Sequence, residues 1–126
     1  MKTTFRQLDS GHNAVNPDRS SLESWYEKVA DVPIDDLSIE DLCRACRQDL
    51  HLPNVLPVAF DRVRINPIAG HMFDGELASA IARIPAHFWA AHANLKKEAK
   101  EVLRAARPEL DQDAGKEVES FLAPNP

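Results

Sequence analysis

Two cysteines, Cys43 and Cys46, are the first residues whose spacing could support chemistry. Three residues apart on a helix, two thiols can meet on one face, as in a metal-binding or redox-active pair. Zinc, however, requires about two further ligands at suitable spacing, and a thiol–disulfide enzyme places its cysteines at a helix N-terminus after a strand. Because the sequence provides neither context, we expect both side chains to pack in the core as small hydrophobic groups.

The five histidines are dispersed, and the two nearest in sequence are His87 and His92. A separation of five residues turns them roughly 140° apart around a helix, whereas two histidines four apart share a face and can bind one metal ion. His12, His51 and His71 are predicted to lie in loops or at helix ends. We therefore expect no metal centre and no cofactor.

Asp74 and Glu76, in the segment DGEL, are a candidate pair of catalytic carboxylates. Aspartate is a favoured N-cap, and the helix dipole favours acids in a first turn, so both residues have structural explanations. Acid–base catalysis also needs a pocket with a second reactive group, and the sequence contains no G-x-S-x-G, G-x-G-x-x-G, H-E-x-x-H or Walker-type motif. We predict no catalytic residues and no enzymatic activity.

The elements that position these residues are predicted to be helices. A chain of 126 residues with 44% hydrophobic and 28% charged residues fits one globular domain. Apolar residues recur at helical spacing, and no stretch alternates with period two for long enough to predict a strand. We therefore predict an all-α fold: a single compact helical domain of about five to six short helices over residues 20–126, preceded by an irregular N-terminal arm over residues 1–19.

The predicted helices cover residues 20–29, 38–50, 54–65, 74–84, 85–107 and 114–122. Four of them begin at a residue that favours an N-cap: Ser20, Ser38, Asn54 and Asp74. Pro57 would then lie in the first turn of its helix, where a missing N–H is harmless, whereas Gly75 would cost its helix roughly 1 kcal/mol relative to alanine. The core is expected to contain four aromatic residues: Trp25, Tyr26, Phe88 and Trp89.

Charge is distributed unevenly along the chain, whose net charge is −5. Between Glu23 and Asp49 eight acids face three bases, whereas between Lys96 and Arg107 five bases face two acids. A negative surface repels nucleic acid and attracts a basic protein surface, although a solvated helix face is the simpler explanation of a charge run. Our hypothesis is that a basic partner binds the acidic residues Glu23, Glu27, Asp31, Asp35, Asp36, Glu40 and Asp41.

Neither a membrane span nor a secretion signal is predicted. No segment approaches the ~18 consecutive apolar residues of a transmembrane helix, and the first residues contain no apolar run like the core of a signal peptide. The sequence therefore predicts a cytoplasmic protein with no membrane partner and no nucleic-acid partner.

A series of short segments in the middle of the chain carries a family resemblance. They are SSLE, PIDDLSIEDL followed by Arg47 and Gln48, LPNVLPVAFDRV, NPIAG, FDGEL and IPAHFW. In their order and spacing these segments resemble the immunity proteins of bacterial contact-dependent growth inhibition (CDI) systems. The arm before Ser20 and the tail after Arg107 lie outside the resemblance.

This resemblance implies a cytoplasmic helical antitoxin that binds the C-terminal toxin domain of a CDI exoprotein, with a 1:1 complex expected. Such toxins are frequently nucleases. The family has no catalytic residues to transfer, and its recurring positions resemble fold determinants: Gln48, Pro57, Pro67, Gly75 and Trp89. Two other classes stay open, a generic helical adaptor with several weaker partners and an enzyme with a pocket of convergent polar groups.

Overall fold

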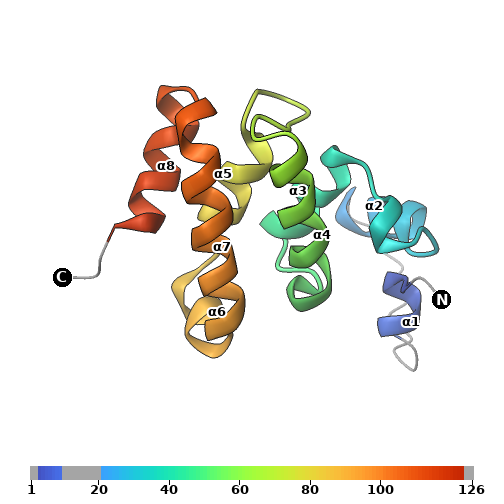
Figure 1. Cartoon of the computed structure of the whole chain (residues 1–126). Coiled ribbons are helices and arrows are strands. Elements are labelled where there is room, and N and C mark those ends of the chain that lie inside the picture. Colours follow the sequence, from blue (N-terminus) through green and yellow to red (C-terminus); the bar gives the residue numbers. More distant parts are fainter. Residues whose placement is uncertain (1–2, 10–20, 124–126) are drawn as a thin grey trace. The chain divides into compact units, whose positions relative to one another are not determined.

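The computed structural model describes residues 3–9 and 21–123, without the side chains of residues 21–23. All regular elements in these ranges are helical, and the predicted all-α class is confirmed (Figure 1). Internal contacts divide the chain into two compact units, one within residues 1–38 and one within residues 39–126. The predicted boundary between residues 19 and 20 is a different division of the chain and stays a prediction.

The first unit contains α1 (Phe5–Leu8), α2 (Ser21–Val29) and the short 3-10 helix η1 (Ile34–Asp36). Residues 3–6 run beside residues 30–34, because the Arg6 N–H donates to the Ala30 carbonyl at 3.0 Å and the Ile34 N–H donates to the Thr3 carbonyl at 2.9 Å. The Phe5 ring is fully buried and stacks on Tyr26, with 6.1 Å between ring centroids. A buried aromatic thus anchors the start of the chain to α2.

Helix α1 lies inside the segment that was expected to be irregular. It begins with a capping box, in which the Thr4 hydroxyl accepts from the Gln7 N–H and the Gln7 side chain accepts from the Thr4 N–H. This reciprocal pair satisfies two N–H groups that an uncapped helix end leaves without partners. The expectation of an irregular arm did not include this helix. Residues 10–20, including the expected cap Ser20, lie outside the described part of the chain.

The second unit contains six α-helices and a second 3-10 helix. They are α3 (Ile39–Arg47), α4 (Leu52–Ile65), α5 (Glu76–Ala82), α6 (Ala86–Ala91), α7 (Ala93–Ala106), η2 (Arg107–Glu109) and α8 (Gln112–Leu122). Helix α5 packs against α3 and α8, and α4 packs against α3 and α7 (Figure 1). Helix α7 buries Ala99, Val102, Leu103 and Ala106 at offsets of three, four and seven, which form one apolar stripe.

Helix α4 begins earlier than its expected cap Asn54. His51 precedes it in a left-handed conformation, with φ 47°, and its carbonyl accepts from the Asn54 and Val55 N–H groups at 2.9 and 3.0 Å. Pro53 therefore occupies the first turn and Pro57 lies inside the helix, where its ring removes one i to i−4 hydrogen bond. The placement of Pro57 in the first turn is a prediction that the structure corrects.

The long helix expected over residues 85–107 is two helices. The chain leaves helical geometry at His92, with φ −135° and ψ 64°, so that α6 ends before it and α7 begins after it. No proline or glycine marks this break, which explains why the sequence did not predict it. Trp89 on α6 is buried, its indole N–H donates to the Ile84 carbonyl at 3.2 Å, and its ring lies 5.3 Å from that of Phe121 on α8.

Candidate protein-binding surface

The first unit carries five of the seven acidic residues of the binding hypothesis. Glu27 on α2, Asp31 after it, and Asp35 and Asp36 on η1 are exposed, whereas the side chain of Glu23 lies outside the described residues. Asp31 accepts a 2.6 Å hydrogen bond from the Arg6 guanidinium, which compensates part of its charge. Because both partners are largely solvated, this ion pair stabilises the fold little.

Glu40 and Asp41, the two remaining acids, lie in the first turn of α3 in the second unit. There the helix dipole favours negative charge, as expected from the sequence. Glu40 is exposed and its carboxylate lies 3.7 Å from the His71 imidazole, whereas Asp41 is half-buried. The acidic residues therefore belong to two structural units, and their joint role in binding stays a hypothesis.

The DGEL segment adopts a different cap from the one predicted. Gly75, with φ 84°, is the N-cap of α5, and Asp74 is exposed in the preceding turn. A left-handed φ is costly for residues with a Cβ, and a Cβ at Gly75 would lie 3.0 Å from side-chain atoms of Ala114 and Leu110. The glycine that was expected to weaken the helix is therefore the residue that its start requires.

Glu76, the second acid of DGEL, is 3% exposed and is the only charged residue in the core of the described chain. Its carboxylate accepts hydrogen bonds from the backbone N–H groups of His71 at 2.8 Å and Met72 at 2.9 Å. The same carboxylate accepts a 2.9 Å bond from the Arg47 guanidinium at the end of α3. Glu76 thus fastens the loop between α4 and α5 to two helices.

These donors explain the charge state of Glu76. Burial on its own raises the pKa of a carboxyl group, but donation by the Met72 and His71 N–H groups and by Arg47 lowers the pKa of Glu76 below its ordinary value. A catalytic general acid at neutral pH needs a raised pKa. The geometry of Glu76 is that of a structural anion.

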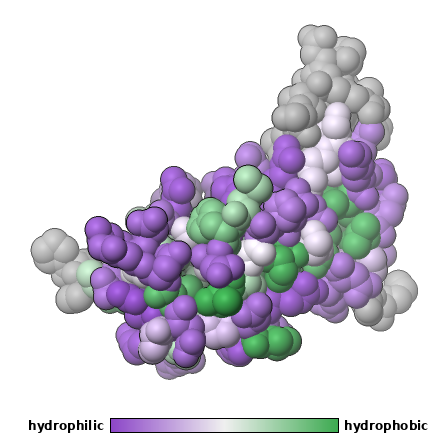
Figure 2. Space-filling model, turned by 90° about the horizontal axis from the view of Figure 1, so that it is seen from above, coloured by the Kyte–Doolittle hydropathy of each residue, from purple (hydrophilic) through white to green (hydrophobic). Residues whose placement is uncertain are grey.

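The loop that Glu76 holds carries an exposed group of apolar side chains. Ile65 is 81% exposed, Met72 75%, Phe73 49% and Ile68 38%, and these are the exposed large hydrophobic residues of the described chain. We call these four residues the 65–73 apolar patch. Figure 2 shows hydrophobic surface lying among hydrophilic residues on the face seen from above. Apolar residues around Asn66-Pro67 and Gly70, a segment with loop signals, were the sequence signal for this patch.

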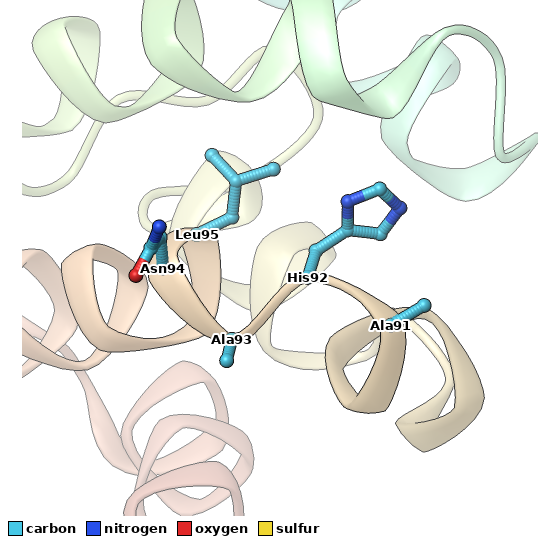
Figure 3. Close-up of a pocket in the computed structure, with 5 residues that line it drawn as sticks. All are labelled: Ala91, His92, Ala93, Asn94 and Leu95. Atoms are coloured by element: carbon cyan, nitrogen blue, oxygen red, sulfur yellow. The ribbon is translucent and has the colours of Figure 1, made fainter.

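The remaining candidates for chemistry do not assemble a reactive site. Cys43 and Cys46 are buried and free, as predicted, and burial raises the pKa of each thiol to about 12. The hollow at the break between α6 and α7 is lined by Ala91, His92, Ala93, Asn94 and Leu95, with one ionisable side chain among them (Figure 3). The His92 ring stacks on Phe88 at 4.3 Å. Across residues 3–9 and 21–123, no three His, Cys, Asp or Glu side chains form a possible metal site.

The described part of the chain is thus all-α, and its exposed residues include most acids of the binding hypothesis and the 65–73 apolar patch. The sequence profile of the CDI immunity proteins matches residues 8–99. The chain belongs to this family, and membership implies a cognate toxin as its partner. No curated protein matches the chain in sequence.

Within residues 3–9 and 21–123, no helix combines the length and the hydrophobicity of a transmembrane segment.

Proposed function

We propose that this protein binds the C-terminal toxin domain of a CDI exoprotein in the cytoplasm and neutralises it as a stoichiometric inhibitor without catalytic activity. The observation that carries the proposal is the family match over residues 8–99, which includes both the acidic residues and the apolar loop. We further propose that the toxin is a nuclease. An enzyme that binds nucleic acid presents a basic surface to its substrate, and acidic residues on an inhibitor can bind such a surface. The exposed acids Glu27, Asp31, Asp35, Asp36 and Glu40 suit such a surface, with Asp41 and Glu23 beside them in sequence.

In this proposal the inhibitor competes with the nucleic-acid substrate for the basic surface of the toxin. Carboxylates that bind Lys and Arg side chains of the toxin occupy positions that phosphate groups would take, and opposite charges also accelerate association. We expect one copy of each protein in the complex, because one inhibitor molecule is enough to block the substrate-binding surface of one toxin domain.

Co-expression with the C-terminal domain of the exoprotein encoded by the neighbouring gene tests the proposal. The two proteins should co-purify, and light scattering after size-exclusion chromatography should give the summed mass of one copy of each. The isolated toxin domain should degrade DNA or RNA, and its activity should reach zero at an equimolar amount of inhibitor. Cells that express the inhibitor should survive the toxin. Turnover of a substrate by this protein, or no protection of the cells, would overturn the proposal.

A further inference from the structure

The 65–73 apolar patch is unusual because four large apolar side chains are exposed within a short stretch of the chain. Each of the six α-helices of the second unit buries large apolar side chains. In contrast, Ile65 at the end of α4 and Ile68, Met72 and Phe73 in the loop after it face solvent within nine residues of chain. Single exposed apolar residues are normal on a protein surface, but grouped ones mark sites of interaction. The composition of the patch also fits, because methionine and aromatic residues are enriched at the centres of interfaces.

The loop that presents the patch is held in place by its own contacts. Buried Glu76 binds the N–H groups of His71 and Met72, the Gly75 N–H donates to the Ile68 carbonyl at 2.8 Å, and the Leu77 N–H donates to the Ala69 carbonyl at 3.1 Å. A Cβ at Gly70 would collide with the carbonyl oxygen of Phe73. A loop fixed in this way loses little conformational entropy when a partner binds, which favours affinity.

Carboxylates border the patch. The Glu40 carboxylate lies 3.7 Å from the imidazole of His71, a residue of the loop. Asp74, immediately after Phe73, is also exposed. At the other end, Arg64 precedes Ile65 and is held by two acids, Asp61 at 2.8 Å and Glu98 at 2.7 Å. The border therefore offers negative charge around an apolar centre, and its best complement is an apolar surface framed by Lys or Arg.

We propose that the 65–73 apolar patch is the centre of the surface on which the toxin domain docks, and that the toxin presents there an apolar area bordered by basic side chains. This inference rests on the proposed function, which supplies a basic protein as the partner. Met72 and Phe73 act as anchors, and Glu76 is a positioning residue that fixes the loop without touching the toxin. Glu40, in the second unit, belongs both to the border of the patch and to the acidic residues of the binding hypothesis.

The test compares two double variants against the purified C-terminal domain of the neighbouring exoprotein. Ile65→Ser with Met72→Ser removes the two most exposed apolar side chains, and Lys97→Ser with Glu101→Ser removes two exposed side chains of α7 at no change in net charge. We expect the first variant to bind at least about tenfold more weakly, through faster dissociation, and the second to bind within about twofold of wild type. The thermal midpoints of both should stay within about 2 °C of wild type.

Two further measurements separate the possible outcomes. Toxin binding should slow hydrogen exchange of the backbone amides in residues 65–73, and the wild-type chain alone should be a monomer by light scattering. If wild type binds the toxin and the Ile65→Ser, Met72→Ser variant binds equally well, the docking site is wrong while the proposed function stands. A wild-type dimer that the same substitutions dissociate, with unchanged toxin affinity, assigns the patch to a second copy of this chain and also overturns the inference. A wild-type chain that does not bind the toxin overturns the proposed function itself.

Discussion

The guanidinium of Arg47 donates a 2.9 Å hydrogen bond to the carboxylate of Glu76, although Arg47 is 44% exposed and Glu76 is 3% exposed. This pair joins the last turn of α3 to the first turn of α5. Because the same carboxylate also accepts hydrogen bonds from the His71 and Met72 N–H groups in the loop between α4 and α5, one buried acid holds three segments together. Its loss would remove the acceptor of three hydrogen bonds, which is costly.

Replacing Glu76 by glutamine tests this arrangement. Glutamine keeps the shape of the side chain but loses the charge and one acceptor, so we expect the free energy of unfolding to fall by about 2 kcal/mol. Urea denaturation followed by circular dichroism measures the change. Glu101→Gln, on the exposed face of α7, is the matched control and should stay within about 0.5 kcal/mol of wild type. An equal loss in both variants would contradict a special role for Glu76.

Acid should remove the advantage of wild type over Glu76→Gln. The pKa of Glu76 in the folded protein lies below its ordinary value of 4.5. Its contribution to stability is therefore complete above pH 4.5 and disappears as the pH falls through the lowered pKa of the folded state. Urea unfolding of both proteins at neutral pH and at successively lower pH should show their stabilities converging in acid. A constant difference across this range would mean that the carboxylate charge is irrelevant.

Gly75→Ala should destabilise the second unit. The glycine has φ 84°, and an added Cβ would lie 3.0 Å from the Ala114 and Leu110 side chains. The left-handed conformation alone costs an L-residue about 1–2 kcal/mol, and the close contact adds to this. Thermal unfolding should give a lower midpoint than wild type, whereas Ser120→Ala on the exposed side of α8 should leave it nearly unchanged. An undiminished midpoint for Gly75→Ala would show that the loop can adopt another turn.

The two thiols should be unreactive in the folded protein. Cys43 and Cys46 are buried, and because the pKa of each is about 12, almost no thiolate exists near neutral pH. Alkylation with iodoacetamide, followed by mass spectrometry, should modify neither residue in buffer and both in concentrated urea. Rapid modification of either thiol in buffer would show that α3 opens or that the cysteine has a role beyond packing.

Charge reversal on η1 should slow association with the toxin. Asp35→Lys with Asp36→Lys places two positive charges where the hypothesis requires negative ones, so we expect the association rate constant to fall by about tenfold at low salt and by less at high salt. Stopped-flow fluorescence measures the rates. Glu101→Lys with Glu109→Lys changes the net charge equally on other exposed positions and is the control.

If the association rate constant falls equally in both charge-reversed variants, the toxin is attracted by the net negative charge of the chain and not by a specific site on η1. Dissociation should change little in either variant, because exposed charges act mainly on the encounter. This behaviour differs from the faster dissociation expected when the 65–73 apolar patch is changed, so the two kinds of contact are distinguishable by kinetics.

The sequence predicted the elements whose signal is local. Apolar spacing located α3 and α8 to within a few residues, and the pattern of Leu42, Cys43 and Cys46 correctly placed both cysteines in the core. The family resemblance was also carried by local segments, because short motifs in fixed order need no structure to be compared. Boundaries were less accurate: His51 is the N-cap of α4 and Gly75 that of α5, where Asn54 and Asp74 were expected.

Glu76 shows what the sequence alone could not provide. An acid in a first helical turn is expected from the dipole, but its burial depends on Arg47, 29 residues earlier, and on two N–H groups of a loop. The exposure of the 65–73 apolar patch also could not be predicted from the sequence. Large apolar side chains are usually buried, and whether those of a loop are buried or exposed depends on the tertiary structure. Periodicity and caps are properties of neighbours in sequence, so the chain determined its helices and its family by itself. Burial and exposure arise from segments far apart in sequence that share one space, and tertiary structure alone decided them.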